Sequence, residues 1–450
     1  MVAVAAAPRP TDDALARARR RTLFILWTTY GSFYLCRANM GPARTALESS
    51  LGIAVDMAYV FGAVKLGYAL GQLVNGQLTE RFGPRRILAI GMIGSACTTL
   101  LIAVAPALAA APVVGSVALG VASALHATGI HSTVSPIVGV LLALAFINGW
   151  FQSGGWPPCV KVAGHWFPVE RRGFTMGILG TSLTLGSALA IAIVGALLGL
   201  FGGWRVAFVV PALLLLASLA HTSLRLKERP PQQDAAAPRA THDRMPLRES
   251  LAATLGNPRI WVLALGLFCL DAVRYGFLDW APGHLTEVQH SGAWASAMKT
   301  AVFPLAGALG AFTSGWITDR FFASRRAPVC ALLLCGVGCF TLAYRVVVDV
   351  GPVPTVVCLG LVGYCLYGAQ ILLVGTAAQD FARKGATAAA AGFVDFMGHV
   401  GAGTGDVVTG NVRTAYGWGA AIGCWAGAAF LAAVLVATLW RAVPQDSSFV

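Results

Sequence analysis

The stretch Gly76-Gln77-Leu78-Thr79-Glu80-Arg81, followed by the basic pair Arg85-Arg86, returns in the second half of the chain. The second copy is Gly315-Trp316-Ile317-Thr318-Asp319-Arg320, followed by Arg325-Arg326, and it begins 239 residues after the first. Each copy comes directly after an apolar segment of about 20 residues, the length that crosses a bilayer as a helix. One copy alone would fit an ordinary basic loop between membrane helices. Two copies at matching positions predict a chain built from two equivalent halves.

Five residues of these loops are candidates for control of conformation. A glycine allows helices to pack closely, while the acid and the arginine can hold neighbouring helix ends together in one conformation and release them in another. We therefore predict a gating role for Gly76, Glu80, Arg81, Asp319 and Arg320.

The composition is that of a membrane protein. Of the 450 residues, 57% are hydrophobic and 11% are charged, and the mean hydropathy is +0.71. Soluble proteins carry roughly 25% charged residues. We predict an all-α membrane protein with twelve transmembrane helices in two pseudo-symmetric six-helix bundles, at residues 22–40, 57–79, 86–106, 137–160, 174–200, 205–224, 258–281, 294–318, 327–349, 353–378, 385–410 and 415–440.

The basic residues orient the chain in the lipid bilayer. The net charge is +13, and 23 of the 32 Lys and Arg residues fall in segments on one side of the predicted spans. This positive-inside bias predicts a multi-pass protein of the cell membrane with both termini in the cytoplasm, and it accounts for the charge without nucleic acid. The expected domains are a basic tail (1–21), a six-helix bundle (22–224), a cytoplasmic linker (225–257), a second bundle (258–441) and a tail (442–450).

The two halves differ in length. Arg37 and Arg274 are 237 residues apart, but Gly173-Phe174 and Gly392-Phe393 are only 219 residues apart. The difference predicts an insertion in the first half between its third and fourth helices, which fits the Ala/Gly/Val-rich residues 107–135.

Arg37 and Arg274 each lie inside an apolar run at matching places in the two halves. A guanidinium stays charged, and placing it in hydrocarbon costs at least about 2.5–3.5 kcal/mol, so such residues usually face an internal cavity. Two fixed cations on one cavity suit a compact double negative charge such as a phosphate. The alternative is a structural ion pair, for which Asp271 and Asp279 are available to Arg274.

Several other polar residues fall at membrane depth. Lys65, Tyr68 and Gln72 share one face of a helix, and Lys65 would either add a third cation or extend to the membrane surface. Tyr68 and Tyr367 could donate hydrogen bonds to a ligand or pack as aromatics. Asp271 and His399 could relay a proton, although a buried histidine is more often a satisfied core residue.

The cysteines and histidines show no catalytic or metal-binding pattern. The ten cysteines form no CxxC pair, and the eight histidines form no HExxH motif. We therefore expect no metal, no cofactor and no enzymatic activity.

Three longer strings are more specific. They are Tyr34-Leu35-Cys36-Arg37-Ala38-Asn39, Gly149-Trp150-Phe151-Gln152-Ser153-Gly154-Gly155-Trp156-Pro157-Pro158-Cys159 and Arg274-Tyr275-Gly276-Phe277-Leu278-Asp279-Trp280. With the two loops and the parallel repeats, they make the chain, over about residues 22 to 440, resemble the organophosphate:phosphate antiporters of the major facilitator superfamily.

The resemblance implies that Arg37 and Arg274 bind the phosphoryl group and that Tyr30, Tyr34, Tyr68 and Tyr367 line the cavity. It also implies a monomer that exchanges a small phosphorylated metabolite, such as a sugar phosphate, for inorganic phosphate by alternating access. The chain departs from the glycerol-phosphate type at Ala38, at Gln72 in place of a lysine, at Asp271 and at His399, positions at which the substrate contacts of that type would differ.

Two alternatives remain open from the sequence. One is a proton-coupled carrier of another small organic anion, a carboxylate or a phosphonate, which Asp271 and His399 favour. The other is a sugar-phosphate sensor that does not transport, because the family contains such a protein.

Overall fold

A computed structural model describes residues 12–130, 132–167, 169–230, 247–322, 325–377 and 387–441. Long apolar helices dominate it, since a backbone in lipid must satisfy its hydrogen bonds internally and a helix does so within one segment. The helices of the first half run α1 (Asp12–Phe33), η1 (Tyr34–Cys36), α2 (Met40–Leu51), α3 (Met57–Phe82), α4 (Pro84–Ala103), α5 (Ala105–Ala110), α6 (Pro112–Ala127), α7 (Pro136–Gln152), α8 (Trp156–Trp166), α9 (Val169–Phe201) and α10 (Val206–Arg225).

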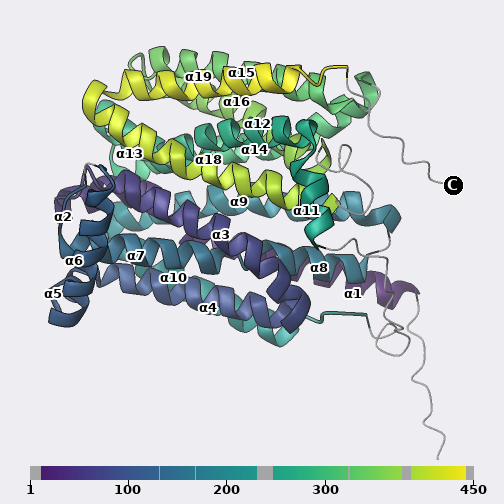
Figure 1. The fold of residues 1–450 in the computed structure, drawn as a ribbon, viewed down its shortest axis with the longest axis horizontal. Helices are drawn as coiled ribbons and strands as arrows, with labels where there is room; N and C mark the ends of the chain where they lie inside the picture. Colours follow the sequence, from purple (N-terminus) through teal and green to yellow (C-terminus); the bar gives the residue numbers. More distant parts are fainter. Residues whose placement is uncertain are drawn as a thin grey trace, which may run out of the picture.

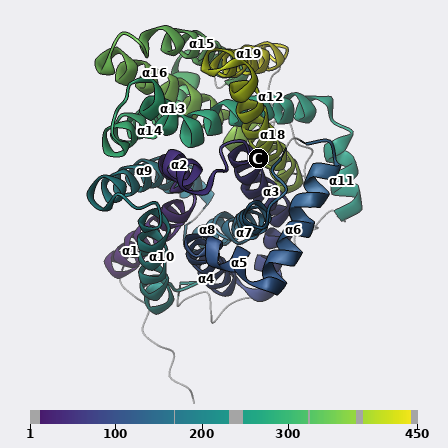
Figure 2. The same cartoon turned by 90° about the vertical axis from the view of Figure 1, so that its left-hand side faces the viewer.

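The second half repeats this order after a short helix in the linker. Its helices are α11 (Leu247–Leu255), α12 (Pro258–Tyr275), η2 (Gly276–Trp280), α13 (Ala281–Val288), α14 (Ala293–Phe321), α15 (Arg326–Val347), α16 (Pro352–Ile371), η3 (Leu372–Ala377), α18 (Thr387–Tyr416) and α19 (Trp418–Ala437). Figure 2 looks along the helices and shows those of the second half, in green and yellow, stacked on those of the first half, in purple and blue.

The predicted spans agree closely with these helices, with two exceptions. Ten spans among the described residues are long and apolar enough to cross a membrane. The span predicted as one helix at 22–40 is wrong in its boundaries, because α1 ends at Phe33 and the chain continues through a 3-10 turn into α2. The other exception is α18, which holds two aspartates and an arginine and is too polar to be among these ten spans. It nevertheless packs along α3 and α12 in the interior.

Both ends of the described chain lie at one end of the molecule, where α1 begins and α19 ends (Figure 1). We call the opposite end, which carries α2 and α13, the distal end. The two halves meet along α3 and α18 and along α9 and α14, and α2 also contacts α13. The distal end is therefore closed by contacts between the two bundles.

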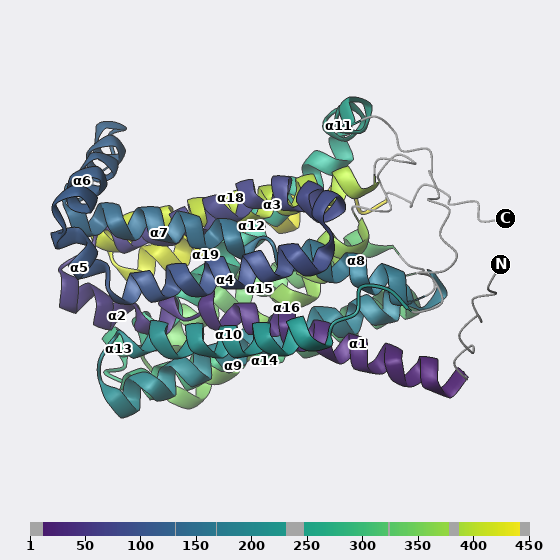
Figure 3. The ribbon, with the colours of Figure 1, turned by 90° about the horizontal axis from the view of Figure 1, so that it is seen from below.

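The predicted insertion forms two helices, α5 and α6, at the distal end. Figure 3 shows α6 running across the direction of the long helices and projecting from the bundle. One side of α6 packs on α7, while Val113 and Val117 on its other side are 78% and 67% exposed. Its sequence contains no Asp, Glu, Lys or Arg.

The glycines of the repeated loops make no close helix contact in this conformation, and their predicted role in gating stays a prediction. A Cβ added at Gly76 or at Gly315 would meet no described atom within 4 Å, so neither glycine permits a close helix contact here. Close approach occurs instead between the bundles. A Cβ added at Gly62 would lie 3.2 Å from Val407 Cγ2 and 3.3 Å from the carbonyl oxygen of Gly403.

We predict that Gly62→Leu forces the distal ends of the bundles apart, because overpacking a tight contact typically costs about 1–3 kcal/mol. The measurement is the distance between nitroxide labels on cysteines introduced at Ala54 and Ala415, which are exposed at the distal ends of α3 and α18. The four exposed native cysteines would first be replaced by serine. Gly427→Leu is the matched control, since an added Cβ there meets nothing within 4 Å. Unchanged label distances in the Gly62 variant would contradict the prediction.

Candidate functional site

The two predicted arginines lie at matching breaks in their helices. Arg37 follows the 3-10 turn η1, and Arg274 is in the last turn of α12, just before the π-helical segment η2. Irregular backbone at membrane depth is tolerated where it lies inside the protein or lines a cavity. The residues of both breaks are buried, and Arg274 itself is only 3% exposed.

Arg37 is held by neutral partners. Its Nε donates to Gln152 Oε1 (3.1 Å), Nη1 donates to the Tyr34 hydroxyl (3.2 Å) and Nη2 donates to the Gln152 carbonyl oxygen (3.3 Å). The guanidinium also lies over the rings of Tyr34 and Tyr68, 4.7 and 4.5 Å from their centroids. No carboxylate of the described chain forms an ion pair with it, so its charge is available to an anionic ligand.

Arg274 is partly neutralised within its own helix. Its Nη1 donates to Asp271 Oδ1 (3.1 Å) one turn earlier, and its Nη2 donates to the Tyr275 hydroxyl (3.4 Å). The structural ion pair weighed for this arginine is therefore present, with Asp271 as the partner. The Nε of Arg274, the Oδ2 of Asp271 and the hydroxyl of Tyr367 are buried without a hydrogen-bond partner in the described part of the chain.

Aromatic side chains surround both arginines. The Arg37 guanidinium lies over Tyr34, and the Arg274 guanidinium lies 4.7 Å from the centroid of the Tyr275 ring. Tyr30 stacks edge-on against Tyr34 with centroids 5.8 Å apart, and Arg274 lies 5.7 Å from the Tyr367 ring. The four predicted tyrosines are thus buried around the arginine pair, and Tyr275 joins them. Tyr275 is part of a string noted in the sequence, although no role was predicted for it.

Gln72 and His399 link the bundles beside this centre. The Gln72 amide donates to Asp395 on α18, and the Tyr68 ring stacks on His399 with centroids 4.2 Å apart. The Nδ1 of His399 lies 3.0 Å from the carbonyl oxygen of Asp395 in its own helix. His399 therefore makes the contacts of a satisfied interior histidine.

Lys65 does not extend to the membrane surface, so that alternative is wrong. It is 4% exposed, pairs with Asp279 and lies 3.5 Å from Asp406 Oδ2. Both acids belong to the second bundle, whereas Lys65 belongs to the first. Asp279 is not paired with Arg274; it lies in the π-helical segment and pairs with Lys65 on α3. Lys65 and Asp279 line the same small pocket as Arg37.

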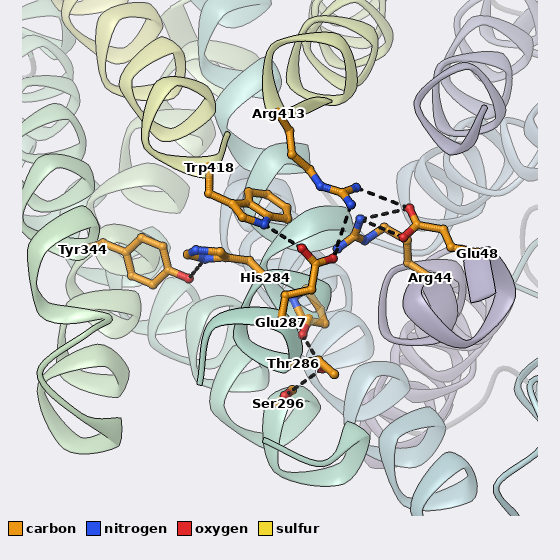
Figure 4. A network of polar contacts seen from close by, with 10 residues as sticks. Arg44, Glu48, His284, Thr286, Glu287, Ser296, Tyr344, Arg413 and Trp418 are labelled. Atoms are coloured by element: carbon orange, nitrogen blue, oxygen red, sulfur yellow. Dashed lines mark hydrogen bonds and ion pairs between the residues drawn. The ribbon is translucent and has the colours of Figure 1, made fainter. Parts of the chain in front are cut away.

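A ring of four charged side chains closes the distal end, and it was not predicted from the sequence. Arg44 contacts Glu48 (3.0 Å) and Glu287 (2.8 Å), and Arg413 contacts the same two acids, each at 3.5 Å. Figure 4 shows Glu287 between the two arginines, with Trp418 donating to its second oxygen. Arg44 and Glu48 belong to the first bundle, and Glu287 and Arg413 to the second. Every ion pair between the bundles in this ring breaks if the distal end opens.

The predicted gating residues stay untested. The side chains of Arg81 and Arg320 are exposed, while those of Glu80 and Asp319 lie outside the described part of the structure. Among the described residues, no group of three His, Cys, Asp or Glu side chains is placed to hold a metal ion.

A family model for the Major Facilitator Superfamily matches residues 26–406, and the chain belongs to this superfamily. It is 28% identical over 444 residues to the glycerol-3-phosphate transporter of Bacillus subtilis (strain 168), covering 96% of this chain and 94% of that one. It is 25% identical to a probable hexose phosphate transport protein of Chlamydia pneumoniae (95% and 92% covered) and to the membrane sensor protein UhpC of Escherichia coli (strain K12) (89% and 88% covered).

A solved structure shares the fold. It is a bacterial homologue of the human lysosomal transporter Spinster in an inward-facing and occupied conformation, with a TM-score of 0.72, 17% identity, and 96% of this chain and 99% of that chain covered. The relatives confirm the resemblance to the organophosphate:phosphate antiporter family. The protein is therefore a multi-pass membrane transporter and not an enzyme.

We predict that Gln152→Leu weakens anion binding by about 5- to 150-fold, because leaving a buried donor unpaired costs about 1–3 kcal/mol. Gln152 accepts from Arg37 and donates to Ser95 Oγ (2.6 Å) and to the Phe33 carbonyl oxygen (3.2 Å), so it fixes the orientation of the guanidinium. The measurement is the rise in Tm with added inorganic phosphate. Gln289→Leu, at the distal end, is the matched control and should keep the rise; equal rises in both variants would contradict the assignment.

We predict that Glu48→Gln opens the distal end, because removing one member of a buried ion pair typically costs about 3–5 kcal/mol. Glu48 is 8% exposed and contacts both arginines of the ring. The labels at positions 54 and 415 should shift to longer distances in this variant. Glu249→Gln, on the exposed helix α11, should leave them unchanged. The ring would have no role in closure if the two variants gave the same distances.

Proposed function

We propose that the protein exchanges a small phosphorylated metabolite for inorganic phosphate across the cell membrane by alternating access. The observation that carries the proposal is the arginine pair. Arg37 has neutral partners only, Arg274 keeps an unpaired Nε, and both stand at buried helix breaks between the bundles. Charge-assisted hydrogen bonds from two guanidinium groups suit the several oxygens of a phosphoryl group.

The surrounding side chains define the rest of the ligand. The tyrosine hydroxyls around the arginines could donate to phosphoryl oxygens, while the unpaired Oδ2 of Asp271 could accept a hydrogen bond from a substrate hydroxyl. A phosphorylated sugar or polyol offers both groups. The names of the relatives, which include glycerol-3-phosphate and hexose phosphate transporters, support the same class of substrate.

The distal ring suggests how exchange is enforced. With the distal end closed by charges from both bundles, the site is sealed on that side, and opening requires the ring to separate. A bound phosphoryl group neutralises the arginine pair and lets the bundles close around it on either side. All these side chains come from one chain, and the basic loops favour cytoplasmic termini, so we propose a monomer with its distal end facing outward.

The test uses purified protein in liposomes loaded with phosphate, to which labelled phosphate is added outside. We expect uptake that requires internal phosphate and that sugar phosphates inhibit. Uptake without internal phosphate but driven by a proton gradient would favour the proton-coupled carrier instead. Ligand binding without any uptake would favour a sensor, the function named for the UhpC relative.

We predict that Arg37→Lys reduces phosphate exchange by roughly 30-fold or more, because losing a buried charged contact typically costs about 2–5 kcal/mol. Lysine keeps the charge but lacks the planar guanidinium, whose several N–H groups can donate to Gln152 and to the ligand at the same time. Arg345→Lys, an exposed arginine on α15, is the control and should exchange at the normal rate. Normal exchange in both Arg37→Lys and Arg37→Ala would refute the assigned role.

A further inference from the structure

The charges buried between the bundles do not balance. Among the described residues, two buried cations face three buried carboxylates there: Lys65 and Arg274 against Asp271, Asp279 and Asp406. Arg37 and Asp395, which are partly exposed, add one charge of each sign. Burying an ionised carboxylate that has no cation of its own is costly, whatever the protein transports. One of the buried carboxylates is therefore the candidate to carry a proton in the closed state, and the geometry indicates which one.

Asp406 is the carboxylate with the weakest support. Its side chain is fully buried, its Oδ1 accepts from Trp280 Nε1 (3.0 Å), and its Oδ2 has no hydrogen-bond partner among the described residues. Its one nearby cation, Lys65, is 3.5 Å away and donates to Asp279 instead. The single ammonium of Lys65 therefore has to compensate two carboxylates, Asp279 and Asp406. Burying an ionised carboxyl without a partner is far more costly than burying a neutral one.

The other acids have better support. Asp271 is paired one to one with Arg274. Asp395 accepts from Gln72, has a side chain that is 21% exposed, and lies 3.8 Å from the imidazole of His399. Water can therefore stabilise the charge of Asp395, whereas Asp406 is fully buried and has only the Trp280 N–H and an ammonium that it shares with Asp279.

The remaining titratable groups around Asp406 do not change this balance. From α3, the nearest charge is Lys65, and from α12 it is the Asp271–Arg274 pair. On α18 itself, His399 lies two turns before Asp406 and Arg413 two turns after it, the latter paired in the distal ring. Helix α19 carries no charged residue.

We propose that Asp406 is a proton-binding site: the cluster of Lys65, Asp279 and Asp406 holds one proton while the distal end is closed and releases it when that end opens. Lys65 comes from the first bundle and both acids come from the second, so separation of the bundles takes the ammonium away and admits water. The proton passes from the Asp406 carboxyl to that water. Both carboxylates are then hydrated, and closing the distal end requires a proton to be taken up again.

The proposal fixes the sign of a pH effect. The closed state holds one more proton than the open state, so acid favours closure and alkali favours opening, by up to about tenfold per pH unit. The distal ring alone would act in the opposite direction, because protonating Glu48 at low pH removes its ion pairs with both arginines. The two effects can therefore be told apart by sign, whichever anion the protein transports.

The experiment measures the distance between the labels at positions 54 and 415 from pH 5 to pH 9, in lipid nanodiscs without substrate. We expect the parent protein to open progressively as the pH rises. Asp406→Asn, which mimics the protonated acid at the same size, should stay closed throughout. Asp279→Asn should do the same, since Lys65 then faces a single carboxylate. Lys65→Met should steepen the response, because two acids must then be protonated together.

Asp349→Asn, which removes an exposed carboxylate at the distal end, is the control and should respond to pH as the parent does. An Asp406→Asn protein with the parent's pH response would overturn the proposal, and so would a parent protein that opens on acidification. Because no phosphate is present, these outcomes are independent of the exchange assay. A failed exchange assay would not contradict the proton site at Asp406. Label distances that do not respond to pH as expected would not contradict phosphate exchange.

Discussion

Every backbone polar group inside a bilayer needs a partner within the protein, and this requirement governs the structure. It makes almost every segment a long helix and confines irregular backbone to places that the protein itself encloses. Here, two such places are η1 and η2, beside Arg37 and Arg274. Each arginine lies directly beside one of these breaks. The two interruptions of the helices therefore mark the position of the candidate site.

The sequence was sufficient for most of the fold because hydrophobic length and positive charge are local properties. The spans from α3 onward start within a few residues of the predicted positions. The first span was misjudged because a continuous apolar run conceals a change of backbone geometry after Phe33. Nothing in hydropathy distinguishes a helix from a helix with a 3-10 turn in it, since both bury the same side chains.

The arginines could be found from the sequence because a charge inside an apolar run, repeated at a matching position, is a strong anomaly. Their partners could not. Gln152 contacts Arg37 from a different helix, and Asp406 meets Lys65 only through the packing of α3 against α18. Such pairs depend on how each helix is rotated about its axis. Asp279 shows the difficulty: it lies five residues after Arg274, a spacing that does not share a helix face, and it pairs with Lys65 of the other bundle.

The insertion makes the two halves unequal. Helix α6 belongs to the first bundle alone, lies across the helix direction and exposes valines such as Val113 and Val117 on one side. The second bundle has no matching helix among its described residues, so the outlines of the two halves differ at the distal end although their long helices repeat.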